Sequence, residues 1–132
     1  MSIFRKTRVS TALVLALSVV PGSGWAHHSS AVFFDLAKRV SLTGTLTKVD
    51  WRNPHIQFSL EAKGDKGQSE LWVIQSGPPG LMKNHSISKA TFEKAIGQTI
   101  TVEANPARDG SRSAELWLIR FPDGTTCCFE LP

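Results

Sequence analysis

Residues 39–51, which read RVSLTGTLTKVDW, decide the fold. Apolar and polar side chains alternate along this stretch, which predicts a half-buried β-strand. The alternation changes parity between Leu46 and Val49, so both can face the core only if the strand carries a bulge or a sharp twist there. Gly44, inside the strand, is typical of tight coiling. We therefore expect a strongly coiled first strand with an irregularity near its middle.

Alternating apolar segments separated by turn residues recur along the rest of the chain, which is typical of an all-β barrel or sandwich. A short tail strand is expected to end at Leu131. Four further strands are expected over residues 55–62, 69–75, 98–104 and 113–121.

One short helix is expected between the third and fourth strands. Ser88 can cap it, Ile87 and Phe92 stand at the positions of a hydrophobic staple, and Gly97 supplies the stop. The resulting order β-β-β-α-β-β is that of the OB-fold, a five-stranded, partly open barrel. We therefore predict a mainly β protein with an OB-like five-stranded barrel and one short helix.

The segment ELWVI at residues 70–74 returns as ELWLI at residues 115–119. In both, the central residues are apolar on both faces, as in neighbouring central strands. In an OB-fold the third and fifth strands lie side by side, so the repeated pattern is consistent with that fold.

The first 26 residues have the features of a secretory signal peptide. Three basic residues precede an apolar run from Val9 to Val20, and the small residues Gly24 and Ala26 stand before the expected cleavage site. The run of about 12 residues is shorter than the roughly 20 that a spanning helix needs, so no membrane insertion is expected after cleavage. We expect cleavage after Ala26 and a periplasmic mature protein.

The mature chain is expected to consist of an N-terminal arm, residues 27–38, and one OB-like β-barrel domain, residues 39–132. The whole sequence carries a net charge of +4, with 15 basic and 11 acidic residues. Because three basic residues belong to residues 1–26, the mature chain has 12 basic against 11 acidic residues. The excess of basic over acidic residues thus lies mainly in the expected signal peptide, and it does not indicate a nucleic-acid partner.

Cleavage after Ala26 would leave His27 and His28 at a free N-terminus. An α-amine and imidazole rings are nitrogen ligands that suit Cu(II), Zn(II) or Ni(II), with copper highest in the stability order. His55 opens the second strand on its polar side, and it would add a third ring if the arm folds back across that strand. Two other interpretations stay open: a frayed N-terminus that happens to begin with histidines, and a polar residue that finishes the Asn53-Pro54 turn.

The outer face of strands two and three is the usual ligand surface of an OB-like barrel. The candidate ligand-binding residues at this face are Trp51, Asn53 and Gln57, although a tryptophan here also suits the core or the barrel rim. His85 is expected in a solvated loop before the helix. No catalytic motif is present, so we do not expect an enzyme.

Cys127 and Cys128 are neighbours in the expected tail strand. A disulfide between them would close a loop too small to restrain the unfolded chain, although an oxidising compartment favours disulfides in general. Strand geometry would place the two side chains on opposite faces. A strained vicinal disulfide, an intermolecular bridge and a thiolate pair for a soft metal stay open as alternatives.

Several segments of the chain together form a recognisable pattern: Ala26-His27-His28-Ser29, Phe34-Asp35, Leu42–Trp51, Asn53-Pro54-His55, Trp72, Ser76-Gly77-Pro78, Gly97, Ala107–Ser111 and Pro122-Asp123-Gly124. Through these segments the sequence resembles a bacterial family of small exported proteins that is catalogued only as a domain of unknown function. The resemblance covers essentially the whole mature chain, and it implies a signal-bearing protein with one β-barrel-like domain and no established activity. Cys127 and Cys128 are not part of the family's pattern.

Two functions fit these observations. The first is a small exported periplasmic protein that binds a transition metal, copper in preference to zinc, through His27, His28 and His55. The second is a metal-free protein- or saccharide-binding OB-like module that uses the outer face of strands two and three. The expected partner is accordingly a metal ion or a periplasmic protein.

Overall fold

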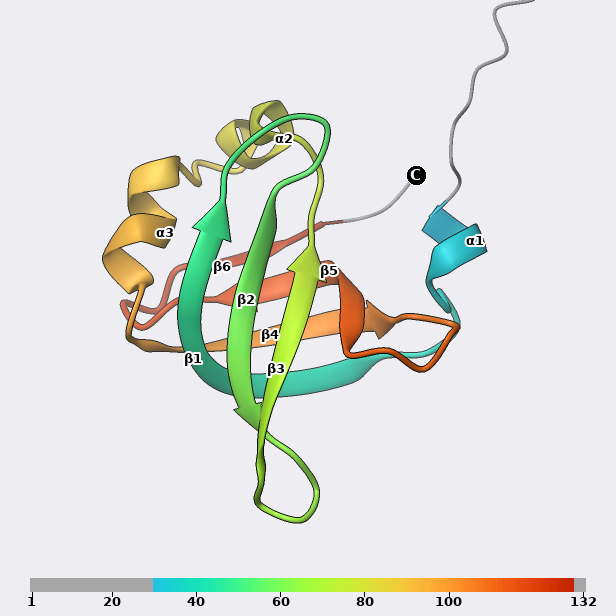
Figure 1. The fold of residues 1–132 in the computed structure, drawn as a ribbon. Helices are drawn as coiled ribbons and strands as arrows, with labels where there is room; N and C mark the ends of the chain where they lie inside the picture. The colour runs from blue at the N-terminus through green and yellow to red at the C-terminus, as the bar shows by residue number, and fades with distance from the viewer. Residues whose placement is uncertain (1–29, 130–132) are drawn as a thin grey trace, which may run out of the picture.

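Five strands close into a barrel in the computed structural model, which describes residues 30–129 (Figure 1). Hydrogen-bonded neighbours follow the order β3-β2-β1-β4-β5, and a parallel pairing between β3 and β5 closes the ring. The strands are β1 (Val40–Asp50), β2 (Gln57–Lys63), β3 (Ser69–Gln75), β4 (Thr99–Pro106) and β5 (Ser113–Arg120). This topology, with a helix between β3 and β4, confirms the predicted OB-like barrel.

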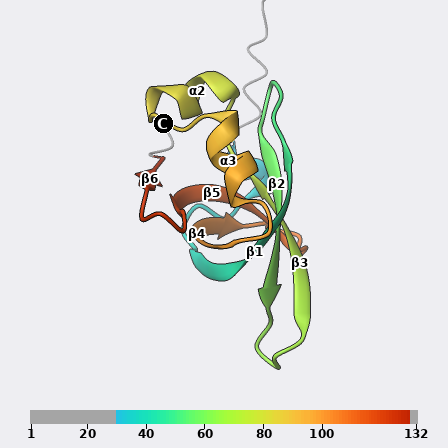
Figure 2. The same ribbon diagram turned by 90° about the vertical axis from the view of Figure 1, so that its left-hand side faces the viewer.

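Three helices and a short sixth strand complete the described chain. Helices α2 and α3 lie at the end of the molecule opposite to the β2–β3 turn, as both views show (Figure 2). Within residues 30–129, no helix is long and apolar enough to cross a membrane. The elements are α1 (Ser30–Phe33), α2 (Pro79–Asn84), α3 (Lys89–Ala95) and β6 (Thr126–Cys128).

β1 is a long, curved strand that belongs to both halves of the barrel (Figure 1). Its first half pairs with β4 and its second half with β2. The register with β2 shifts between Leu46 and Lys48, which leaves Thr47 as an extra residue. Leu46 is fully buried and Val49 packs against the core on the other side of this shift. The bulge expected from the change of parity is therefore confirmed.

Gly44 lies at the point where β1 passes from one partner to the other. It stands opposite Ala62 of β2 and also opposite Ile100 of β4. A Cβ atom at this position would overlap the backbone carbonyl group of Glu61. The missing side chain thus allows β2 to approach β1 closely where the strand bends.

Helix α3 begins where the sequence predicts. The Ser88 side chain accepts a hydrogen bond from the Thr91 backbone N–H, and the Thr91 hydroxyl accepts one from the Ser88 N–H, which together form a capping box. Phe92 is fully buried, and its ring centroid lies 5.3 Å from that of Phe58 and 5.2 Å from that of Phe121. The helix is therefore attached to the barrel through one aromatic cluster.

The sequence does not predict helices α1 and α2. In α2, Pro79 stands at the first helical position, where its missing N–H costs no hydrogen bond. His85, expected in a loop, is the exposed C-terminal cap of α2, and its ring meets the edge of Phe129 with centroids 5.0 Å apart.

The sequence correctly predicts that β3 and β5 are neighbours, but not their register or their burial. In the β3–β5 pairing, Gln75 lies opposite Glu115. The similar segments 70–74 and 115–119 are therefore not paired residue by residue but are displaced along the strand direction. The expectation that β3 is buried on both faces is wrong, because the side chains of Leu71 and Val73 are 58% and 37% exposed. Among the described elements, none covers this part of the outer face (Figures 1 and 2).

The predicted tail strand corresponds to β6, which pairs with β5; Leu131 lies beyond the described residues. Both thiols are free: Cys127 is buried and Cys128 is exposed. Burial raises the pKa of the Cys127 thiol. The two neighbours therefore lie in different environments, as the alternation of a strand requires.

We expect the variant Gly44→Ala to lower the free energy of unfolding by about 1–3 kcal/mol, because the added methyl group overlaps the Glu61 backbone. Gly80→Ala is the matched control. A Cβ at Gly80 has open space around it and lies within α2, so this change should stabilise the protein by about 0.5–1 kcal/mol. Urea denaturation measures both, and equal stability of the two variants would contradict the close approach at Gly44.

Candidate functional site

The described part of the N-terminal arm, residues 30–38, is attached to the connection between β4 and β5. Phe34 is buried and forms an isolated antiparallel bridge with Ala107. The Asp35 N–H donates to the Pro106 carbonyl at 2.9 Å, and the Arg108 N–H donates to the Phe33 carbonyl at 2.9 Å. The arm therefore adds backbone pairing to the end of the barrel.

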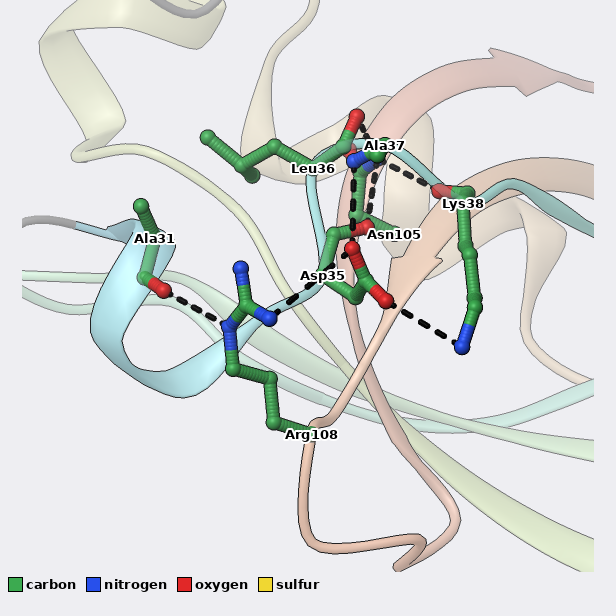
Figure 3. Close-up of polar contacts among 7 residues, drawn as sticks. All are labelled: Ala31, Asp35, Leu36, Ala37, Lys38, Asn105 and Arg108. Carbon is green, nitrogen blue, oxygen red and sulfur yellow. Dashed lines mark hydrogen bonds and ion pairs between the residues drawn. The ribbon is translucent and has the colours of Figure 1, made fainter.

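Asn105 holds the arm from below (Figure 3). This residue is buried, and its side-chain amide donates to the backbone carbonyl oxygens of Lys38 at 2.8 Å and Leu36 at 3.3 Å. A third, longer contact reaches the carbonyl oxygen of Asp35 at 3.5 Å. One buried amide thus satisfies several carbonyl groups of a segment that lacks regular secondary structure.

Arg108 and Lys38 hold the same segment from its exposed side. The Arg108 Nε donates to the Ala31 carbonyl at 2.8 Å, and its Nη1 lies 4.0 Å from the Asp35 carboxylate. Lys38 Nζ lies 3.3 Å from the other carboxylate oxygen of Asp35 (Figure 3). The hydrogen bond from Lys38, with smaller contributions from the Ala37 N–H and Arg108, keeps the pKa of Asp35 below its ordinary value.

A hollow of about 490 Å³ lies between α1, the turn before β2 and the β4–β5 connection. Phe33 of α1 and Phe34, which follows this helix, form part of its wall, and Pro54, which follows a cis peptide bond, forms another part. Its polar lining residues come from four separate segments: Ser30, His55, Gln75, Asp109, Ser111 and Ser113.

His55 is exposed, and its ring is oriented by a backbone group. The Nδ1 atom lies 3.2 Å from the Ser76 carbonyl oxygen. Because a carbonyl oxygen only accepts hydrogen bonds, Nδ1 is the donor, and in the neutral ring Nε2 keeps its lone pair. Histidine ligands of metal ions are commonly oriented in this way through their second ring nitrogen.

Glu115 is a buried acidic residue beside this hollow, with 6% of its surface exposed. It stands opposite Gln75 on the outer face of the barrel, where the arm covers it. Its Oε1 atom accepts a hydrogen bond of 2.5 Å from the Ser30 hydroxyl. Its Oε2 atom is buried without a hydrogen-bond partner, and no other side-chain oxygen or nitrogen in residues 30–129 is in this condition.

Burial raises the pKa of Glu115 above its ordinary value, because the charged form loses its hydration. The hydrogen bond from Ser30 and the charge of a protonated His55 act in the opposite direction, with smaller effect. Compared with an exposed glutamate, the charged form of this carboxyl is therefore disfavoured unless a cation lies beside it.

Of the predicted site residues that the structure describes, only His55 lines the hollow. Pro54 and His55 line the hollow, whereas Trp51 packs against Phe92 of α3, with ring centroids 5.7 Å apart. Asn53 and Gln57 are exposed and do not line the hollow.

Two of the predicted metal ligands, His27 and His28, and the expected signal peptide, residues 1–26, lie outside the described residues. Within residues 30–129, no three His, Cys, Asp or Glu side chains are grouped so that they could hold a metal ion.

Sequence reasoning missed Glu115, Asn105 and Arg108. Glu115 begins the segment ELWLI, in which the sequence pattern does not distinguish it from an ordinary strand residue. The one feature that could have indicated its burial is that it lies on the outer side of a strand that has apolar residues on both faces. Arg108 lies in the segment Ala107–Ser111 that matches the family pattern, but nothing near Arg108 or Asn105 in the sequence indicates their partners, which lie about 70 to 80 positions earlier in the chain.

The topology and the contacts of the arm define the protein as an OB-like barrel with an N-terminal arm fastened to its β4–β5 connection. The chain belongs to a family of unknown function (DUF6152), whose profile matches residues 14–115. The matched range includes His27, His28, His55 and Glu115.

Among solved structures, the chain is similar to the crystal structure of the mitochondrial single-stranded DNA binding protein Rim1 from S. cerevisiae. The TM-score is 0.48 and the sequence identity 15%, over 64% of this chain and 94% of that chain. No protein among the curated sequences compared matches this chain.

We expect the metal-free variant Glu115→Gln to be more stable than the unmodified protein at pH 7.5, by on the order of 1 kcal/mol. Because the pKa of Glu115 is raised above 4.5, its carboxyl favours folding below that pH and loses this contribution as the pH rises through the folded-state pKa. The gain should therefore disappear near pH 4. Urea denaturation at the two pH values measures it, and the exposed Glu61→Gln is the control. A gain of equal size at both pH values would contradict the prediction.

Proposed function

We propose that the mature protein is exported to the periplasm and binds a transition metal ion, copper in preference to zinc, through His27, His28 and His55. The observation that carries this proposal is the contact between Ser30 and Glu115 beside the hollow that His55 lines. It fixes the first described residue of the chain at the edge of that hollow. In the sequence, only Ser29 separates Ser30 from the two histidines of the proposed mature N-terminus.

The length of the intervening chain supports the proposal. An extended chain advances at most about 3.3–3.6 Å per residue, so His28 stays within about 7 Å and His27 within about 11 Å of Ser30, measured along Cα atoms. Both distances are comparable with the dimensions of the hollow. The arm is fastened by Asn105 and Arg108, which keeps this tether short.

The chemistry of the groups also supports a metal ion. His55 has its Nδ1 engaged by a carbonyl group, which leaves Nε2 for coordination. Cleavage after Ala26 would add the α-amine and ring of His27 and the ring of His28. Such a set of nitrogen ligands suits Cu(II) and Zn(II), and Cu(II) stands higher in the stability order.

The proposal predicts that Cu(II) binds the protein that starts at His27 at least about 10-fold more tightly than the same protein with its α-amine acetylated. Acetylation blocks the amine without placing another residue before the first histidine. Isothermal titration against a competing chelator measures the affinity, and Zn(II) is titrated in parallel. His55→Ala should weaken binding, whereas His85→Ala, at the far end of α2, should leave it unchanged. Equal affinity of the two N-terminal versions would remove the amine from the site.

A second candidate is a metal-free module that binds a protein or saccharide on the outer face of β2 and β3. The exposure of Leu71 and Val73 on that face favours it. Glu70, the neighbour of Leu71 on β3, forms an ion pair of 3.0 Å with Arg112.

In the presence of a chelator, the unmodified protein should retain a periplasmic protein or polysaccharide. This alternative predicts that the double variant Leu71→Ser/Val73→Thr no longer retains that partner. Replacement of two exposed apolar side chains by polar ones removes contact area without touching the core. Retention by the triple variant His27→Ala/His28→Ala/His55→Ala would support the alternative. Loss in that variant, with recovery on addition of Cu(II), would contradict it.

A further inference from the structure

We infer that helix α1 is a proton-sensitive lid on the hollow, which is fastened while the Glu115 carboxyl is protonated and opens more often once that carboxyl is ionised. Residues within the described range 30–129 carry each step. The lid needs no bound metal, and it therefore goes beyond the proposed function.

α1 is the part of the arm that can open without disturbing the barrel. None of its residues is buried, and the side chains of Val32 and Phe33 are 65% and 56% exposed. Phe34, which follows the helix, is buried and forms a bridge with Ala107, so the arm stays anchored behind α1. A local opening costs less than global unfolding when it breaks few buried contacts. Because Ser30 and Phe33 line the hollow, opening of α1 would remove part of its wall.

The hydrogen bonds that fasten α1 differ in their response to pH. The Arg108 Nε donates to the Ala31 carbonyl at 2.8 Å, and the Arg108 N–H donates to the Phe33 carbonyl at 2.9 Å. Backbone groups do not titrate and a guanidinium stays charged, so pH does not change these two bonds. The Ser30 hydroxyl, by contrast, donates at 2.5 Å to the carboxyl group of Glu115, which can be neutral or charged.

The arm covers Glu115 with groups that do little to stabilise its charge. Asn105 and Glu115 are antiparallel partners on the same face, and the Asn105 amide is directed to the Lys38 carbonyl of the arm. Oε2 of Glu115 is buried without a hydrogen-bond partner in the described residues. Burial raises the pKa of Glu115 more than the Ser30 hydrogen bond and the charge of His55 lower it.

The other charges around the arm do not titrate in place of Glu115. The hydrogen bond from Lys38 keeps the pKa of Asp35 below its ordinary value, so Asp35 is ionised over the range in which Glu115 loses its proton. His55 is the one charged group that acts on the pKa of Glu115. The charged and titratable groups of the neighbouring elements are Asp35, Lys38 and Arg39 of the arm, Arg108 and Asp109 of the β4–β5 connection, and His55 before β2.

Lid opening and proton binding are therefore linked. Opening of α1 returns the carboxyl to water, where its pKa falls back towards the ordinary value. Because the closed lid raises the pKa of Glu115, the closed state binds the proton more tightly than the open state does. The proton favours closure fully below pH 4.5, and this contribution is lost as the pH rises through the closed-state pKa. The hollow is thus more accessible near neutral pH than in acid.

Amide hydrogen exchange of the metal-free protein that starts at His27, followed by NMR at pH 4.5 and 7.5, tests the lid. The Arg108 N–H reports opening of α1, and the Leu46 N–H, bonded to the Gln98 carbonyl, reports the barrel. At pH 7.5 we expect Arg108 to have a protection factor at least about 10-fold lower than that of Leu46. We also expect the protection factor of Arg108 to fall about 5- to 10-fold between pH 4.5 and pH 7.5.

In Glu115→Gln, whose side chain is neutral at both pH values, Arg108 should be equally protected at both. Glu61→Gln, which changes an exposed carboxylate on β2, is the matched control and should keep the pH dependence. Protection of Leu46 shows in each variant that the barrel is folded.

A lid controlled by Glu115 is overturned if Arg108 shows no pH dependence in the unmodified protein, or if the dependence survives in Glu115→Gln. If it survives there and is lost in His55→Gln, the imidazole is the titrating group instead. Equal protection of Arg108 and Leu46 would also overturn the lid, because α1 would then open only when the barrel unfolds. No metal is present in these measurements, so their outcome leaves the proposed function to the Cu(II) titrations.

Discussion

The site depends on the parallel pairing of β3 with β5, which closes the barrel. This pairing sets Gln75 opposite Glu115 and brings the residue after Gln75, whose carbonyl orients the His55 ring, to the same end of the barrel. Only three residue pairs form it, so it relies on the curvature of β1 to bring β3 and β5 together. The bend at Gly44 and the bulge at Thr47 provide that curvature.

The arm changes the chemistry of the barrel's outer face. Glu115 lies on a face that is open to water elsewhere, as the exposure of Leu71 and Val73 shows. Where the arm crosses this face, the carboxyl group is buried, and its pKa rises. The amide of Asn105 and the guanidinium of Arg108 hold the arm there by hydrogen bonds to backbone carbonyls. The fold thereby keeps an acidic group in an environment that favours a cation beside it.

Under the proposed function, removal of the signal peptide is part of the chemistry of the site. The cut after Ala26 would create the amine of the first ligand, and the arm would carry it towards His55. Signal removal would also discard most of the net positive charge. A nearly neutral protein would then attract the ion through its local ligands, and long-range charge would contribute little.

The sequence by itself determined the features that depend on near neighbours along the chain. The approximate extent of the strands, the bulge after Leu46 and the cap at Ser88 follow from alternation and from hydrogen bonds between close residues, although β2 begins at Gln57 and leaves His55 in the preceding turn. The candidate histidines also came from the sequence. Only the tertiary structure decided that Glu115 is buried and that Asn105 holds the arm, because their partners lie 85 and about 70 positions away. A residue's local pattern cannot show which distant segment will cover it, since that depends on how the closed barrel brings the ends of β3, β4 and β5 to the arm.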